Sequence, residues 1–144
     1  MHPASPLRPA AGTGLTLPLY LAQVPAGFPS PADDYVESRL DLERLLVKRP
    51  AATFIVKASG HSMQPAICSG DLLIVDRSVE PRNGSIVIAI VSGELTVKYY
   101  RRQDGRVHLV PANPRYKPLA PDPEQECTIW GVVTYIVRDV CTRS

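Results

Sequence analysis

The sequence is short of long apolar runs, of charge of one sign and of paired cysteines. No apolar run approaches the roughly 20 residues that a membrane-spanning helix requires. The run from Leu15 to Ala22 is interrupted by Pro18 and preceded only by Arg8, which disfavours a secretory signal. Lys and Arg total 16, Asp and Glu total 14, and the net charge is +2, without the basic excess typical of chains that bind nucleic acid through its phosphates. We therefore expect a cytoplasmic protein with no membrane attachment and no direct sequence-specific DNA binding.

The three cysteines, Cys68, Cys127 and Cys141, are an odd number and show no CxxC or Cys and His ligand spacing. This pattern argues against a disulfide framework and against a structural zinc site, and it suits a reducing compartment. We expect three buried, unreactive thiols, no metal ion and no cofactor.

Proline is abundant at the start of the chain, where seven of the 15 prolines fall within the first 31 residues. Proline fixes φ and lacks a backbone donor, so this segment is expected to form neither a helix nor an interior strand. It is instead predicted to be an extended, mobile N-terminal arm. A helix start is predicted at Ser30–Pro31, and a short helix at Asp41–Leu46, capped by Asp41 and limited by Pro50.

From residue 53 onward the sequence is typical of β-strands. Six segments are rich in Val, Ile, Thr and aromatic residues, and turn signals such as Asn83-Gly84 and Asp104-Gly105 separate some of them. These segments are Thr53–Ala58, Asp71–Asp76, Ser85–Val91, Leu95–Arg101, Arg106–Val110 and Thr128–Arg138. Because no helical pattern lies between them, they predict a compact, mostly antiparallel β domain.

Ser62 stands where the first predicted strand must change direction, and a serine hydroxyl needs a base within hydrogen-bond reach to act as a nucleophile. His61 is expected to point away from Ser62 in an extended chain, and nothing ties His108 to this point. Lys98, in the middle of a predicted strand, can act as the base if burial lowers its pKa and leaves it neutral. The alternative is an ordinary exposed strand lysine.

The backbone N–H groups of Ser62 and Met63 are placed to form an oxyanion hole, although Met63 also fits a residue that fills the core beneath the turn. The small residues Ala26 and Gly27, flanked by apolar ones, are what a narrow protease cleft accepts as an extended peptide. A plain linker kink is the alternative. The basic residues Lys98, Arg101, Arg102 and Arg106 fit either a solvated strand end or a docking patch for an acidic partner.

An ordered set of motifs links the chain to a known family. The set comprises Ala26–Glu37, Asp41-Leu42, Phe54–Gly60, His61-Ser62-Met63, Ile67, Gly70–Asp76, Glu94–Lys98, Asn113 and Gly131-Val132-Val133. Together these motifs resemble the LexA-like self-cleaving serine peptidases, and more closely the UmuD family of SOS mutagenesis proteins, over roughly Ala26 to Arg138. Between Met63 and Ile67 this chain has only Gln64-Pro65-Ala66, one residue fewer than is usual in that family, so the loop after Ser62 is expected to differ in shape.

The resemblance implies a mostly β, LexA/UmuD-like peptidase domain of curled antiparallel sheets with a short helix, preceded by a mobile N-terminal arm. It implies an arm at 1–26 that self-cleavage removes, a linker arm with a short helix at 27–50, and a peptidase and dimerisation domain at 51–144. Ser62 is implied to be the nucleophile, Lys98 the general base and Ala26–Gly27 the scissile bond.

The resemblance also implies partners. A RecA-type recombinase filament on single-stranded DNA is expected to stimulate self-cleavage. The truncated chain, beginning at Gly27, is expected to form a homodimer and to act with a UmuC-type polymerase in error-prone translesion synthesis. The strand Thr128–Arg138, with Trp130, is a candidate to pair with the second copy.

Three other classes of protein share some of these features. A non-enzymatic interaction module would keep the same β fold as a scaffold and would never cleave. A signal-peptidase-like enzyme also uses a Ser-Lys pair but is expected to carry a membrane anchor. A LexA-type repressor is disfavoured because the 26 residues before the implied cut are too few for a DNA-binding domain.

Overall fold

The computed structural model describes residues 15–20, 36–120 and 127–141, and it divides the chain into two compact units, 1–48 and 49–144. The predicted helix start at Ser30–Pro31 and the implied cleavage site at Ala26–Gly27 lie outside the described residues. In the described part of the chain, no helix is long and apolar enough to cross a membrane.

The described residues of the first unit form two short strands and one short helix. Strands β1 (Thr16–Tyr20) and β2 (Val36–Asp41) pair antiparallel, with Pro18 opposite Arg39. Neither strand is among the segments predicted from the sequence. Pro18 is tolerated because each strand of a two-stranded sheet has one unpaired edge, where a missing backbone donor costs little.

Helix α1 (Leu42–Leu46) follows β2 directly and confirms the predicted short helix. The carboxylate of Asp41 accepts a hydrogen bond from the backbone N–H of Arg44 at 3.2 Å, which is the expected N-cap. A single 3₁₀ turn, η1 (Pro50–Ala52), begins the second unit.

The second unit is a six-stranded sheet in which every pairing is antiparallel, so the mostly β prediction is confirmed. Its strands lie in the order β3-β4-β8-β5-β6-β7. Their bounds are β3 (Thr53–Lys57), β4 (Leu72–Asp76), β5 (Ile86–Val91), β6 (Glu94–Gln103), β7 (Arg106–Val110) and β8 (Cys127–Val137). These bounds differ from the predicted ones by at most two residues at either end.

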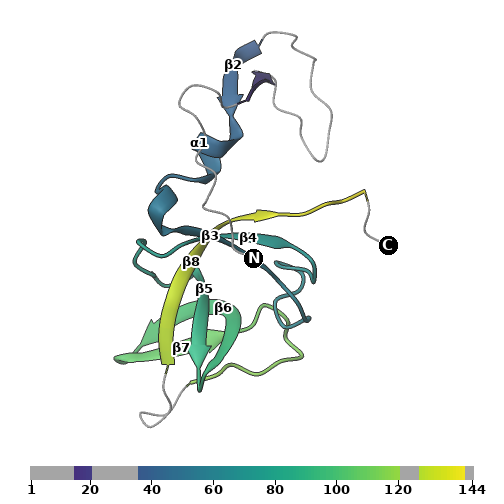
Figure 1. Ribbon diagram of the computed structural model, residues 1–144. Helices are drawn as coiled ribbons and strands as arrows, with labels where there is room; N and C mark the ends of the chain where they lie inside the picture. The colour runs from purple at the N-terminus through teal and green to yellow at the C-terminus, as the bar shows by residue number, and fades with distance from the viewer. Residues whose placement is uncertain (1–14, 21–35, 121–126, 142–144) are drawn as a thin grey trace, which may run out of the picture. The chain divides into compact units, whose positions relative to one another are not determined.

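The longest strand, β8, joins the two halves of this sheet (Figure 1). Residues 127–133 pair with β5, and residues 132–137 pair with β4. Only residues 132 and 133 therefore have strand partners on both sides, while residues 127–131 pair with β5 alone and residues 134–137 with β4 alone among the described residues. Trp130 packs on Phe54, with ring centroids 5.4 Å apart, and on Arg77, whose Cζ lies 4.6 Å from the ring centroid. The contact of this strand with a second copy stays a prediction.

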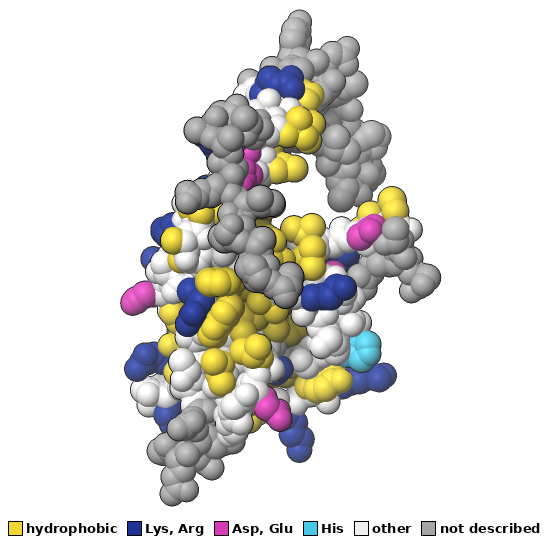
Figure 2. All heavy atoms as spheres, in the orientation of Figure 1, with side chains coloured by type: hydrophobic (Ala, Val, Ile, Leu, Met, Phe, Trp, Pro, Cys, Tyr) yellow, Lys and Arg dark blue, Asp and Glu magenta, His cyan; other side chains and the backbone are white. Residues whose placement is uncertain are grey.

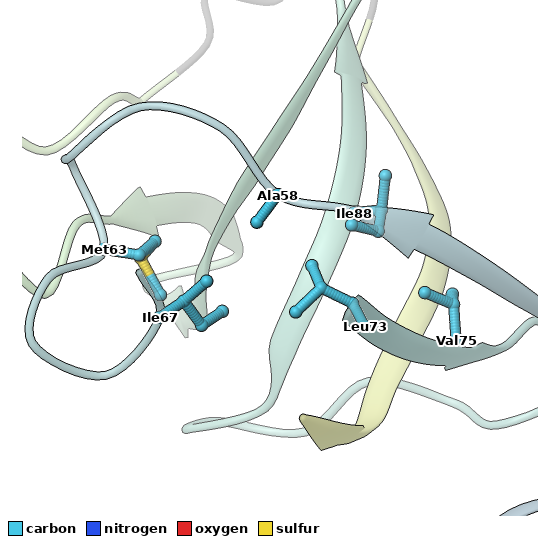
Figure 3. Close-up of a cluster of buried hydrophobic side chains, with 6 residues drawn as sticks. All are labelled: Ala58, Met63, Ile67, Leu73, Val75 and Ile88. Carbon is cyan, nitrogen blue, oxygen red and sulfur yellow. The ribbon is translucent and has the colours of Figure 1, made fainter. Parts of the chain in front are cut away.

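Two hydrophobic clusters form the core. The first gathers residues from β3, β4, β5 and the loop between β3 and β4, and Figure 3 shows Met63 and Ile67 on that loop beside Leu73 and Val75 of β4. The second cluster lies around β5, β6, β7 and β8 and includes the fully buried Val87 and Leu109. The first cluster is the floor on which the candidate active site is built.

Two buried aspartates hold the ends of β4. Asp71 accepts two hydrogen bonds from the Arg138 guanidinium, at 2.9 and 2.7 Å, and one from the N–H of Cys68 at 2.8 Å. Asp76 accepts from the hydroxyl and the N–H of Ser78 and from Arg49, and the Ser78 hydroxyl is the main reason that the pKa of Asp76 lies below its ordinary value. Both carboxylates are thus buried with partners, as buried charges must be.

Candidate active site

Ser62 lies on the loop between β3 and β4, and this loop is closed at its base. The N–H of Ala58 donates to the carbonyl of Asp71, and the N–H of Gly70 donates to the carbonyl of Ala58, both at 2.8 Å. Gly60, two residues before Ser62, has φ +86°, a backbone conformation that favours glycine, and it turns the chain after the end of β3.

Two side chains of the same loop anchor it to the core. Met63 and Ile67 are 4% and 3% exposed and belong to the first cluster, as Figure 3 shows. The expectation that Met63 fills the core beneath the turn is confirmed. Because the residue directly after Ser62 is buried, the serine is held on a fixed backbone rather than on a free loop.

Lys98 reaches Ser62 from β6, where it pairs with Val87 of β5. Its Nζ lies 3.1 Å from Ser62 Oγ, 2.7 Å from Thr96 Oγ1 and 3.1 Å from the carbonyl oxygen of Val97. The structure therefore brings together the two side chains, 36 positions apart, that the sequence singled out as a pair.

Burial lowers the pKa of Lys98 below its ordinary value, because desolvation disfavours the ammonium form. In the structure Nζ donates to all three oxygens. When the amine loses a proton it keeps two N–H donors, which the Val97 carbonyl and the Thr96 hydroxyl can accept. The lone pair so formed then faces the Ser62 hydroxyl.

The pair opens into a pocket of about 230 Å³ between the end of β3 with its following loop and the start of β6. Its apolar lining includes Val56, Ile88, Leu95 and Val97, and its polar lining includes Lys57, Ser59, Ser62, Thr96 and Lys98. No His, Asp or Glu is among the described residues that line the pocket. Among the described lining residues, Lys98 is the titratable side chain that contacts Ser62.

The other predicted residues take different positions. His61 is exposed, and His108 lies on β7 opposite Arg101. Arg101, Arg102 and Arg106 are exposed, at the end of β6 and the start of β7. The prediction of three buried thiols is wrong: Cys68 and Cys127 are half-buried and Cys141 is exposed. The reason is that their segments lie at the ends of strands or beyond them.

Sequence reasoning gave no role to four residues that hold this site. Thr96 contacts Lys98 and stands two positions before it on the same strand face, a spacing that was available as a signal. Asn113 contacts the carbonyls of His61 and Ser62 from a loop about 50 positions away, and no local pattern indicates that contact. Asp71 and Arg138 lock the end of the Ser62 loop, and their pairing also depends on the fold.

The described parts of the chain contain no cluster of side chains suited to bind a metal ion. No group of three His, Cys, Asp or Glu side chains there is close enough to hold a metal ion.

Comparison with known proteins identifies the family of this chain. The model of the Peptidase S24-like family matches residues 18–134, which include both Ser62 and Lys98. The chain belongs to this family.

Relatives named in the comparison extend the match. Protein SamA of Salmonella typhimurium is 48% identical over 85% of this chain and 86% of its own length. Protein ImpA of Escherichia coli is 44% identical over 92% of this chain and 91% of its own length. Protein MucA of Escherichia coli is 42% identical over 89% of this chain and 90% of its own length. A LexA repressor of Bordetella petrii is 39% identical over 86% of this chain but only 55% of its own length.

These matches confirm the resemblance drawn from the motifs. The chain is a UmuD-family SOS mutagenesis protein with an S24-type serine peptidase domain, and its relatives share most of their length with it.

Proposed function

We propose that the chain cleaves itself at Ala26–Gly27, with Ser62 as the nucleophile and Lys98 as the general base. The observation that carries this proposal is the 3.1 Å contact between Lys98 Nζ and Ser62 Oγ at a lysine whose pKa is lowered by burial. A neutral amine at hydrogen-bond distance is what a weakly nucleophilic hydroxyl needs.

In the proposed reaction, Ser62 Oγ attacks the carbonyl carbon of Ala26 while Lys98 takes the hydroxyl proton. The carbonyl oxygen becomes an oxyanion, which the N–H groups of Ser62 and Met63 are proposed to stabilise. When the C–N bond breaks, Lys98 returns the proton to the departing amine of Gly27. Water then hydrolyses the ester on Ser62, with Lys98 acting again as the base.

The pocket suits a peptide substrate that belongs to the same chain. Its apolar lining can accept small residues, and its modest volume suits the Ala26–Gly27 sequence. Tethering raises the effective concentration of the cleavage segment, so the pocket need not bind a free peptide tightly.

The downstream role that we propose is the one known for the UmuD family. A RecA-type filament on single-stranded DNA stimulates cleavage, and the product beginning at Gly27 forms a homodimer that works with a UmuC-type polymerase in translesion synthesis. Support for an assembly surface comes from large exposed hydrophobic residues of the second unit, among them Phe54, Ile55, Leu72, Ile136 and Val137. Figure 2 shows hydrophobic side chains gathered on one face of this unit.

The first prediction concerns the catalytic pair. Ser62→Ala and Lys98→Ala should each abolish release of residues 1–26, because one removes the nucleophile and the other the base. Intact-mass spectrometry after incubation at alkaline pH, and again after incubation with a recombinase filament on single-stranded DNA, measures the loss of the arm. N-terminal sequencing of the wild-type product should read from Gly27.

The control variant is Ser69→Ala, which changes an exposed serine of the same loop outside the pocket lining and should cleave at the wild-type rate. Loss of the arm in either catalytic variant would remove the assignment. A wild-type chain that never cleaves under either condition would instead favour the non-enzymatic scaffold.

A further inference from the structure

Asn113 forms two hydrogen bonds to the loop that carries Ser62. The side-chain Nδ2 of Asn113 donates to the carbonyl of His61 at 3.0 Å, and the backbone N–H of Asn113 donates to the carbonyl of Ser62 at 3.0 Å. Two consecutive carbonyls of the nucleophile turn are thus directed at one residue. The N–H of Gln64 also donates to the His61 carbonyl, at 3.1 Å.

Asn113 is itself fixed in the orientation that this contact requires. Its Oδ1 accepts from the N–H of Arg115 and its carbonyl accepts from the N–H of Tyr116, both at 3.0 Å. Because Oδ1 is taken by a donor, the other end of the amide must be the NH₂ group, which faces His61. The preceding Pro111 is buried, and Ala112 packs on the first hydrophobic cluster, so the turn that holds Asn113 is anchored to the core.

The direction of these carbonyls determines where the neighbouring N–H groups point. In a trans peptide the C=O and the following N–H point in opposite directions, and among the described residues only the Gln64–Pro65 bond is cis. The N–H groups of Ser62 and Met63 therefore point away from Asn113. Both residues line the pocket and Asn113 does not, and within the described part of the chain neither N–H has a hydrogen-bond acceptor.

We infer that Asn113 is a positioning residue for self-cleavage, which turns the carbonyls of His61 and Ser62 outward so that the N–H groups of Ser62 and Met63 face the reacting carbonyl oxygen. The inference rests on the proposed function and deepens it. Asn113 does not touch the reacting atoms, and it acts through the backbone of the nucleophile turn. The energetic reason is that an oxyanion hole works only when its donors are oriented before the charge develops.

The experiment compares Asn113→Ala with a matched control, Asn83→Ala, in the full-length chain. The Asn83 side chain also accepts a backbone N–H, from Arg102, but it lies at the β5–β6 end away from the pocket lining. Cleavage rates are measured by intact-mass spectrometry across neutral to alkaline pH. Asn113→Ala should cleave about 10- to 100-fold more slowly than the wild type. This rate loss is no larger than that caused by removing a whole oxyanion donor, which is about 10²- to 10³-fold. Asn83→Ala should cleave at the wild-type rate.

The pH profile separates this role from a general loosening of the site. Asn113 makes no contact with Lys98, so the pH at which the rate is half-maximal should stay at the wild-type value. A residue that merely held Ser62 against Lys98 would, when removed, expose the lysine to water and move this midpoint upward. A slow variant with a shifted midpoint would therefore overturn the inference.

A second variant guards against misfolding. Asn113→Asp keeps the shape and the Oδ1 acceptor for Arg115 but replaces the donor that faces His61 with an oxygen, and it should be slow like Asn113→Ala. Circular dichroism melting identifies which variants keep the native fold, and a wild-type rate in either folded variant overturns the inference. Failure of the proposed function has a different signature, because then the wild-type chain and the Asn83→Ala variant would not cleave either.

Discussion

At the scale of single residues, the proposed cleavage depends on the protonation state of Lys98. The amine is half-buried beside a hydroxyl and a carbonyl oxygen, and desolvation lowers its pKa from the ordinary 10.5. No carboxylate among the described residues lines the pocket to hold the charged form. In the proposed reaction the base is thus a lysine whose pKa is lowered by burial rather than a histidine.

The second prediction follows from the direction of this shift. Only neutral Lys98 can accept the Ser62 proton, so the rate of cleavage without a recombinase should rise about tenfold per pH unit below the pKa in the folded protein. Because that pKa lies below 10.5, the rate should level off at a lower pH than an unshifted lysine would give. Intact-mass spectrometry over a pH series measures this curve, and a rate that does not change from neutral to strongly basic pH would count against Lys98.

At the scale of elements, the close approach of β4 and β8 explains why Gly131 lies in the middle of a strand. A Cβ at position 131 would lie 2.5 Å from Cγ1 of Val75 and 3.2 Å from Cγ of Arg77. Val75 is fully buried in the first cluster and cannot move away freely. Glycine thus lets β4 and β8 pack at a point where β8 also pairs with Ile88 of β5.

Gly131→Ala is the third prediction, and it should destabilise the fold by about 1–3 kcal/mol, as overpacking of a filled core does. Chemical denaturation of the wild type and of the variant, both carrying Ser62→Ala to prevent cleavage, measures the change. Val75→Ala removes Cγ1, the atom that a Cβ at position 131 would meet. Gly131→Ala should therefore lower the free energy of unfolding by less in the Val75→Ala background than in the wild type. Equal costs in the two backgrounds would show that Val75 is not the obstacle.

At the scale of the whole molecule, the two units differ in how much they bury. The members of both hydrophobic clusters lie between residues 56 and 133, all in the second unit. In the first unit α1 has no buried residue, and Leu17, Leu19 and Leu42 are exposed. A two-stranded sheet without a packed face is marginally stable in water, so stability should reside in the second unit.

The fourth prediction tests this division by expressing the two units separately. A fragment of residues 49–144 should show a cooperative thermal transition and a β-type circular dichroism spectrum, because it keeps both clusters and the entire six-stranded sheet. A peptide of residues 1–48 should show no cooperative transition. Absence of a transition in the larger fragment would mean that the first unit supplies part of the core.

Local patterns were enough to predict the strands of the second unit and the helix α1. Alternating β-branched residues, Asn-Gly and Asp-Gly turns and the Asp41 cap are signals within a few residues of the structure that they specify. The strands β1 and β2 were missed because Pro18 argues against a strand, and a two-stranded sheet removes that objection only when the pairing is known.

The sequence by itself determined the chemistry: a serine at a glycine turn, a lysine amid strand residues, and the order of motifs that identifies the family. Only the tertiary structure decided which groups touch. The curled sheet brings β6 beside the loop after β3, and the loop at residues 111–116 brings Asn113 against the carbonyls of His61 and Ser62. The physical reason is that the pKa of Lys98 and the direction of the N–H groups depend on burial and on contacts between distant segments, and these exist only after the chain has folded.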